Sequence, residues 1–233
     1  MGLSENLAPT LFTPTIGLLG GSFDPIHVGH IALARAASVA LKLNELQFLP
    51  AAAPRQKGAL KTVAQHRLAM VQLAVAAISG RIAESDTQVT VNDYEINHPG
   101  PNYTVDTLTA LRSQVAPQTR LVFIIGSDQL RNLATWSRYE SLLSLAHIAV
   151  TQRGQVSMQN LPAPVEAMVQ AHGSDALTNS PAGSIVFFRM PPVAVSSTQM
   201  RMALQANSPQ TALVANLLPA GVFQYLQQHK LYK

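Results

Sequence analysis

The amino-acid sequence predicts an α/β fold built on a doubly wound parallel sheet, and three observations support that prediction. Short apolar runs rich in β-branched residues alternate along the chain with longer segments of helical periodicity. Residues 121–125 form a continuous apolar run that ends at Gly126, as is typical of a strand buried on both faces of a sheet. Strands that alternate with helices connect through right-handed crossovers, and this produces a parallel sheet covered by helices on both faces.

The expected elements follow one another in this alternating order. The first strand begins just after Pro14, and an Ala-rich helix follows it. The second helix places Leu68, Val71 and Val75 on one face, which indicates a helix packed on the sheet. Strands are expected at residues 15–19, 46–49, 89–96, 121–125, 147–151 and 185–188. Helices are expected at residues 28–41, 64–78, 105–115 and 139–145, with two or three more after the last strand.

Residues 154–184 interrupt the alternation. This stretch is rich in Gln, Pro, Ala, Gly and Ser and has room for one short helix at residues 165–171, so it is expected to be a surface insertion. The chain shows no internal repeat and no linker that would divide it. We therefore expect one domain over residues 1–233, with residues 1–11 disordered and residues 196–233 forming a small C-terminal helical part.

The composition excludes several classes of protein. Hydrophobic residues make up 47% of the 233 and charged residues 12%, which is typical of a globular chain with a substantial core. Cysteine is absent from the sequence, so disulfides, thiolate nucleophiles and cysteine-based zinc sites are excluded, and a reducing compartment is favoured. The first residues lack the pattern of a secretory signal, and the apolar runs are too short to cross a bilayer. We therefore expect a cytoplasmic protein without membrane contact.

The charge balance indicates small anionic partners. The chain has 16 Lys and Arg residues against 12 Asp and Glu, a mild excess that could attract either nucleic acid or small polyanions. A nucleic-acid surface needs a basic stripe, and small anions such as nucleotides are favoured here because the basic residues are scattered. Those in the first third of the chain are Arg35, Lys42, Arg55, Lys57, Lys61 and Arg67.

The most informative segment is GGSFDPIHVGH at residues 20–30, which follows the first strand and opens the first helix. Its two glycines allow a tight turn whose backbone N–H groups can approach an anion. His27 and His30 are three residues apart, so they lie on one face of the helix at its positive end, where a phosphate is stabilised. The alternatives are an ordinary strand–turn–helix with two incidental histidines, or a metal pair that would need further ligands. We favour phosphate binding.

A second anion-binding segment is VSSTQMR at residues 195–201. Hydroxyl side chains and unpaired N–H groups at a helix start can hold an anion together, and here the hydroxyls belong to Ser196, Ser197 and Thr198. Arg201 follows one turn later on the same face and can reach the same anion. Taken alone, the segment would rather indicate an ordinary capped surface helix.

Together the two segments resemble those of the HxGH nucleotidyltransferase superfamily, whose members transfer a nucleotidyl group from a nucleoside triphosphate on a Rossmann-like fold. The resemblance implies that His27 and His30 are the catalytic histidines and bind the phosphates. It also implies ATP contacts for residues of the glycine turn and of the second segment, which is similar to the superfamily's ISSTxxR element. These residues are Gly21, Ser22, Phe23, Ser196, Ser197, Thr198 and Arg201.

Three further segments resemble one branch of the superfamily, the nicotinate-nucleotide adenylyltransferases. Residues 102–108, NYTVDTL, are similar to the SYTxxTL segment of that family. Residues 123–136 are similar to its FIIGxDxLxxLxxW segment, and residues 221–232 to its C-terminal VxxYIxxxxLY ending, which we interpret as structural packing.

The same resemblance implies roles for five residues of these segments. Gly126 and Asp128 are expected to contact the ribose and adjacent groups of ATP. Tyr103, Thr104 and Trp136 are expected to bind the acceptor mononucleotide, with Trp136 stacking on the pyridine ring. An isolated Trp136 would more simply be a core anchor, and Asp128 a helix cap.

Two loops depart from the family pattern. Where the family has a PPHK-like loop, residues 54–57 read PRQK; Lys57 is then a candidate to neutralise phosphate of the mononucleotide, and a solvated surface lysine is the alternative. Where the family has RPG, residues 153–155 read RGQ, and Arg153 is a candidate to face the adenine of ATP.

The resemblance implies adenylyl transfer from ATP to nicotinic acid mononucleotide, with Mg²⁺ as the cofactor that accompanies ATP and no protein metal site. The acceptor's 5′-phosphate has a second pKa of about 6 and is largely ionised at neutral pH, so the reaction needs no general base. Three alternatives stay open: a superfamily member acting on phosphopantetheine, a non-catalytic nucleotide sensor, and a nucleic-acid-binding module. Monomer and homodimer are both compatible with the sequence.

Overall fold

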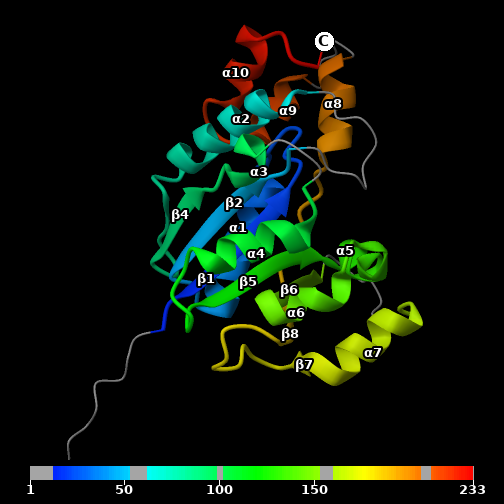
Figure 1. Ribbon diagram of the computed structural model, residues 1–233. Helices are drawn as coiled ribbons and strands as arrows, with labels where there is room; N and C mark the ends of the chain where they lie inside the picture. Colours follow the sequence, from blue (N-terminus) through cyan, green and yellow to red (C-terminus); the bar gives the residue numbers. More distant parts are fainter. Residues whose placement is uncertain (1–12, 53–61, 99–101, 153–159, 206–210, 233) are drawn as a thin grey trace, which may run out of the picture.

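The computed structural model describes residues 13–52, 62–98, 102–152, 160–205 and 211–232. The expected α/β fold is confirmed, because helices cover both faces of one eight-stranded sheet (Figure 1). The six expected strands are β1 (Thr15–Gly21), β2 (Glu45–Pro50), β4 (Thr87–Val91), β5 (Arg120–Gly126), β6 (His147–Gln152) and β8 (Ile185–Arg189). Two short strands that the sequence does not predict lie at the sheet edges, β3 (Arg81–Ile82) and β7 (Gly173–Ser174).

The order of the strands identifies where a ligand would bind. They lie in the order β3-β4-β2-β1-β5-β6-β8-β7, and every neighbouring pair is parallel except β3 with β4. The chain runs outwards from β1 through β2 to β4 and then returns to place β5 on the other side of β1. Ligands of such sheets bind beside this reversal, at the carboxyl ends of the strands. The candidate site therefore belongs next to Gly21 and Gly126, where β1 and β5 end.

The helices divide between the two faces of the sheet. They are α1 (Val28–Leu41), α2 (Ala64–Ala77), α3 (Tyr94–Asn97), α4 (Thr104–Ser113), α5 (Ser127–Arg131), α6 (Leu142–Leu145), α7 (Ala163–His172), α8 (Ser197–Gln205), α9 (Thr211–Asn216) and α10 (Val222–Gln228), with 3₁₀ turns η1 (Leu133–Thr135) and η2 (Tyr139–Ser141). One apolar core joins the sheet to α1, α2 and the C-terminal helices, and a second joins it to α4, α5, α6 and α7. In the described part of the chain, no helix is long and apolar enough to span a bilayer.

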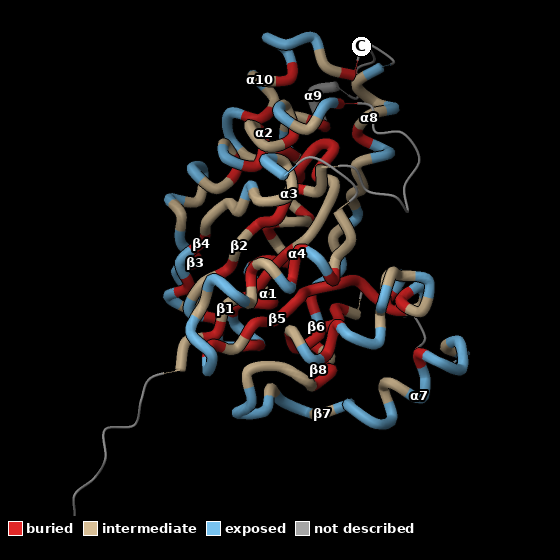
Figure 2. The backbone as a smooth tube through the Cα atoms, viewed as in Figure 1, coloured by how far each residue is buried: buried red, intermediate tan, exposed pale blue. Residues whose placement is uncertain are grey.

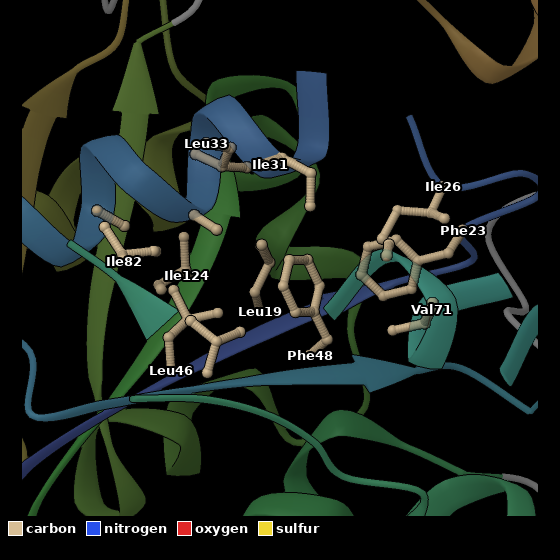
Figure 3. Packing of buried hydrophobic residues seen from close by; sticks show 14 of the residues in the cluster. Leu19, Phe23, Ile26, Ile31, Leu33, Leu46, Phe48, Val71, Ile82 and Ile124 are labelled. Carbon is tan, nitrogen blue, oxygen red and sulfur yellow. The ribbon is translucent and has the colours of Figure 1, made fainter. Parts of the chain in front are cut away.

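The turn after β1 is anchored in the first of these cores. Strands β5 and β6 are buried almost throughout their length (Figure 2). Phe23, from the turn itself, is 1% exposed and packs edge-on against Phe48 of β2 at a ring-centroid distance of 5.6 Å (Figure 3). Ile26 of the same turn is fully buried. Burial of each such side chain stabilises the fold by about 1.5–3 kcal/mol, so the turn is held firmly against the sheet.

One predicted strand is wrong in its second half. The sequence predicts a strand over residues 89–96, whereas β4 ends at Val91 and α3 begins at Tyr94. The reason is local, because the Asn92 side-chain oxygen accepts a hydrogen bond from the Tyr94 N–H at 3.0 Å and turns the backbone out of the strand. The predicted helix over residues 139–145 begins as the turn η2 and becomes α-helical only in α6.

The segment after β6 contains the short helix that the sequence predicts near residues 165–171, present as α7. This helix buries Val165 completely in the second core. A buried histidine fastens the rest of the segment to the sheet. The Nε2–H of His147 in β6 donates to the Ser180 carbonyl at 2.9 Å, and Nδ1 accepts the N–H and hydroxyl of Ser184 at 3.1 and 2.6 Å.

These contacts require a neutral imidazole and predict a pH-dependent stability. Burial lowers the pKa of His147, helped by the positive charges of Arg120 and Arg112 and opposed by the bond to Ser180. Such a group contributes stability above its ordinary pKa of about 6.5, and this contribution is lost as the pH falls through the lowered folded value.

Replacing the buried histidine should therefore reduce the loss of stability on acidification. His147→Gln should make the free energy of unfolding fall less steeply between about pH 7 and pH 5, by up to about 1.4 kcal/mol per pH unit. Urea denaturation at a series of pH values measures this slope, and His98→Gln, at an exposed histidine, is the control. Equal slopes for His147→Gln and the unsubstituted chain would contradict the prediction.

Candidate active site

The glycines at the end of β1 let the turn pack directly against aromatic rings. A Cβ at Gly20 would lie 3.3 Å from the ring of Phe123 in β5, and a Cβ at Gly21 would lie 2.9 Å from the ring of Phe23. The second distance is shorter than real Cβ contacts allow, so a larger residue at Gly21 would displace Phe23 from the core. The side chain of Phe23 is buried beneath the turn, which leaves the half-buried Gly21 and Ser22 nearest the surface.

The two histidines of the turn stack on each other at the start of α1. Their ring centroids are 3.8 Å apart, and the edge of Phe23 meets His30 at 5.0 Å. The backbone N–H of His27 donates to His30 Nδ1 at 3.2 Å, which leaves the ring proton of His30 on Nε2. His27 is only 3% exposed whereas His30 is half-buried, so His30 is the outer member of the pair.

The second predicted segment lies against the first. The Ser197 hydroxyl donates to the Pro25 carbonyl at 3.0 Å across 172 residues of sequence. The Arg201 guanidinium donates to the Asp24 carbonyl at 2.7 Å and to the Thr198 hydroxyl at 3.2 Å. The structure therefore brings together the two segments that the sequence predicts to bind anions.

Two of the three hydroxyls that the sequence predicts to bind an anion make hydrogen bonds within the protein. Ser196 Oγ accepts the Gln199 N–H at 3.2 Å and so caps α8, while Ser197 Oγ is used in the bond to the turn. Thr198 is exposed and Arg201 is half-buried. The side chains best placed to meet a ligand are therefore those of Thr198 and Arg201.

Gly29 explains how closely the two segments meet. A Cβ at this position would lie 2.9 Å from Val195 Cγ1 and 3.0 Å from His27 Nδ1. Only glycine therefore lets Val195, the first residue of the second segment, pack against the first turn of α1.

Asp24 and Tyr232 form a buried support that the sequence analysis missed. The Tyr232 hydroxyl donates to Asp24 Oδ1 at 2.6 Å, with Asp24 2% and Tyr232 7% exposed. Burial raises the pKa of Tyr232 well above its ordinary value, and the bond to Asp24 raises it further, so the phenol keeps its proton. Tyr232 thus holds the turn after β1 in place. The sequence predicts only a packing role for residues 221–232 and does not indicate this hydrogen bond.

Arg67 is a second support that the sequence analysis missed. The sequence shows Arg67 only as one of several scattered basic residues. In the structure its side chain is completely buried in α2. Its guanidinium donates to the carbonyls of Ser22, Ala51, Ala52 and Thr62 at 2.6–3.2 Å. Burial lowers the pKa of Arg67, while the negative groups nearby, Asp24 first among them, act in the opposite direction.

Asp128 and Trp136 follow β5, which lies on the other side of the point where the order of the strands reverses. Asp128 is exposed in the first turn of α5, and its carboxylate lies over Gly126 so closely that a Cβ there would collide with it. Trp136 is half-buried and meets the ring of Phe123 edge-on at 6.1 Å. Phe123 also packs against Gly20, so its ring contacts both Trp136 and the end of β1. Its Nε1 is buried and finds no hydrogen-bond partner among the residues that the structure describes.

Tyr103 and Thr104 lie at the start of α4, with Tyr103 at the N-cap position and packed on the same core as Trp136. Lys57 and Arg153 lie outside the described residues. Within the described ranges, no group of three or more His, Asp and Glu side chains could hold a metal ion. The described part of the site therefore offers an imidazole N–H, a guanidinium and helix N-termini, which are donors suited to a polyanion.

Comparison with known proteins agrees with this geometry. A family model described as cytidylyltransferase-like matches residues 18–203. A "Probable nicotinate-nucleotide adenylyltransferase" of Pseudomonas syringae pv. tomato is 36% identical over 219 residues, covering 94% of this chain and 93% of the relative. One of the same name from Herminiimonas arsenicoxydans is 38% identical over 227 residues, covering 95% and 98%.

Solved structures share the fold. The Plasmodium falciparum nicotinic acid mononucleotide adenylyltransferase complexed with NaAD superposes with a TM-score of 0.71, covering 94% of this chain and 97% of that one. The same protein complexed with APC gives 0.69. The sequence identity is 20% in both cases, so these likenesses bear on the fold alone.

Proposed function

The chain belongs to the nicotinate-nucleotide adenylyltransferase family, and from that premise we propose that it transfers the adenylyl group of ATP to nicotinic acid mononucleotide. The products are pyrophosphate and nicotinic acid adenine dinucleotide, the precursor of NAD. One observation carries the proposal beyond family membership. Ser197 and Arg201 of the second segment donate hydrogen bonds to the turn after β1. The donors of both segments therefore lie together beside β1, where the order of the strands reverses.

The negative charges of the two substrates determine what the enzyme must do. An oxygen of the acceptor's 5′-phosphate bonds to the α-phosphorus of ATP, and the bond from that phosphorus to the oxygen bridging to the β-phosphate breaks. The nucleophile is already ionised at neutral pH, so the main obstacle is repulsion between two anions. Catalysis then consists of positioning and neutralisation, with His30 Nε2–H donating to the phosphates and Arg201 holding the outer ones.

We propose Mg²⁺ as the ion that accompanies ATP. Mg²⁺ commonly keeps several waters and binds through substrate phosphates with one or two carboxylates, so it needs no cage of protein ligands. Asp24 lies within the first segment, but its carboxylate accepts the Tyr232 hydroxyl and lies 3.9 Å from the Arg201 guanidinium. The exposed Asp128 fits a role toward a hydrated ion or the ribose. When bound, Mg²⁺ would neutralise part of the triphosphate charge.

The acceptor would lie on the β5 side of the site. Trp136 would stack on the pyridine ring, and Tyr103 and Thr104 would hold its carboxylate. Lys57 is proposed to neutralise the acceptor's phosphate and Arg153 to face adenine. Trp136 Nε1 has no hydrogen-bond partner within the described part of the chain, which supports a place for a polar partner beside this ring.

Pyrophosphate release from ATP tests the proposal directly. The enzyme is supplied in turn with nicotinic acid mononucleotide, nicotinamide mononucleotide and phosphopantetheine. Release should be fastest with the first. Release with phosphopantetheine alone would move the chain to another branch of the superfamily, and no release with any acceptor would favour a nucleotide sensor.

Arg201→Ala should raise the KM for ATP about ten- to hundred-fold, because a charge-assisted hydrogen bond contributes about 1.5–3 kcal/mol. The KM for the mononucleotide should change little. Arg201→Lys should rescue poorly, since its point charge lacks the planar fork that meets both Asp24 and Thr198. Steady-state kinetics with each substrate varied in turn provides the check. Normal ATP kinetics with weakened mononucleotide binding would show that this segment serves the acceptor instead.

A further inference from the structure

Arg67 connects the glycine turn to the loop that follows β2. One of its terminal nitrogens donates to both the Ser22 carbonyl at 2.8 Å and the Ala51 carbonyl at 2.6 Å. The other donates to Ala52 at 2.8 Å. A fully buried guanidinium with so many carbonyl partners ties two separate loops to one rigid helix, because each carbonyl would lose a partner if it moved.

Glu95 interacts both with the same loop, at Ala52, and with α4, at Thr107. Its carboxylate accepts the Thr107 hydroxyl at 3.0 Å, and its backbone carbonyl accepts the Asn102 amide at 2.9 Å. Burial raises the pKa of Glu95, whereas hydrogen bonds from Thr107 and from the Ala52 backbone, and the charge of Arg67, lower it. Glu95 thus contacts the residue that Arg67 also holds, and it reaches α4 through Thr107.

These contacts form one continuous path between the two halves of the proposed site. It runs from Ser22 through Arg67 to Ala52, and from there through Glu95 to Thr107, one turn after Thr104 in α4. The first end lies in the turn that would hold ATP, and the second lies in the helix that would hold the mononucleotide. Arg67 and Glu95, which lie between the two ends, need not touch either substrate.

We propose that Arg67 and Glu95 are a pair of positioning residues. They would set the distance between the turn after β1, which would hold ATP, and α4, which would hold the mononucleotide. The proposal rests on the function proposed above. Its physical basis is that attack on phosphorus requires the reacting atoms to be about 3–3.5 Å apart, and a misplacement of about 1 Å can lower the rate about a hundred-fold. A pair that fixes the spacing should affect turnover much more than the binding of either substrate alone.

Glu95→Gln is the sharpest test, because it keeps size and shape. A glutamine can still accept the Thr107 hydroxyl, but it removes the negative charge that attracts the buried guanidinium of Arg67, so the attraction between the two residues is lost. We expect kcat to fall about ten- to hundred-fold, while the Kd of ATP and of the mononucleotide, each measured alone, change less than about three-fold. Arg67→Lys should lose at least as much kcat, since an ammonium offers three donors in place of the guanidinium's five.

Glu45→Gln is a matched control. Glu45 is also half-buried and accepts the Thr90 hydroxyl at 2.8 Å and the Gln47 amide at 3.0 Å, but it lies at the amino-terminal end of β2, whereas the proposed site lies at the carboxyl ends of the strands. Both hydrogen bonds go to one oxygen, which a glutamine can replace, so this variant should leave kcat unchanged. The double variant Arg67→Lys/Glu95→Gln adds a second check, because losses along one path should be smaller together than the product of the single losses.

Several results would overturn the inference. Unchanged kcat in Glu95→Gln, or a kcat loss no larger than in Glu45→Gln, would leave only a structural role. A raised Kd for the mononucleotide with normal kcat would make Glu95 a binding residue. Failure of the unsubstituted enzyme to release pyrophosphate would instead overturn the proposed function, so the two failures are distinguishable.

Discussion

Replacing His30 with alanine is expected to lower kcat by about two to three orders of magnitude while the protein remains folded. Loss of one preorganised donor to charge that develops in a transition state costs about 2.7–4 kcal/mol. His30 is the outer histidine of the stacked pair, and its Nδ1 accepts the His27 N–H, so the donor that it would turn to phosphate is Nε2–H. Turnover at saturating substrates, measured beside a melting curve, gives both quantities from one preparation.

Two companion variants separate the catalytic role from the helix-capping role of His30. His30→Gln and His30→Glu can both reach back to the His27 N–H, as the third helical residue does in a capping box, and should recover much of the stability lost in alanine. Glutamine also keeps a donor, so it should recover part of the activity. Glutamate should be at least as stable as alanine but less active, because its charge repels the phosphates. If activity followed stability across the three variants, His30 would be a cap and nothing more.

The fold could be predicted from the sequence wherever an element was long enough to show its period. Each expected strand is found, and α1 begins and ends where its pattern predicts. The elements that were missed, such as β3, β7 and α3, have two to four residues, too few for a period of either kind to appear. The turn at Asn92 could have been anticipated, because Asn followed by Asp is a common way to end a strand.

The candidate site could be predicted only where its signal is local. Glycine, histidine and hydroxyl residues at a strand end or a helix start can be recognised from neighbouring positions, and both segments are indicated in this way. The structure brings the two segments into contact, and their binding of phosphate stays a prediction. The sequence does not reveal Tyr232 because its partner Asp24 lies 208 residues away. It does not reveal Arg67 because the partners are backbone carbonyls, 5 to 45 residues away, which any residue type could supply. A buried arginine in a helix has the same sequence pattern as a solvated one, and only the packed structure distinguishes them.

The largest difference expected between substrates is a preference for nicotinic acid mononucleotide over nicotinamide mononucleotide by several orders of magnitude. The start of α4 is the reason. A helix start presents N–H groups without intrahelical partners and a positive dipole end, and both favour a carboxylate. The one acidic side chain of that first turn, Asp106, is paired with Arg138 at 2.6 Å, so its charge is largely compensated.

A carboxamide would bring its own NH₂ donors against these N–H groups and leave donors unpaired in a desolvated pocket. Sites built on hydrogen-bond complementarity reject such analogues by about 10⁴–10⁵-fold. Trp136 would stack on either pyridine ring, so Trp136→Ala should weaken both mononucleotides about equally and leave their ratio unchanged. The measurement is kcat/KM for the two acceptors at saturating ATP and Mg²⁺. Equal values in the unsubstituted enzyme would contradict a carboxylate pocket at α4, and a ratio that collapses in Trp136→Ala would transfer the selectivity from the helix start to the indole ring.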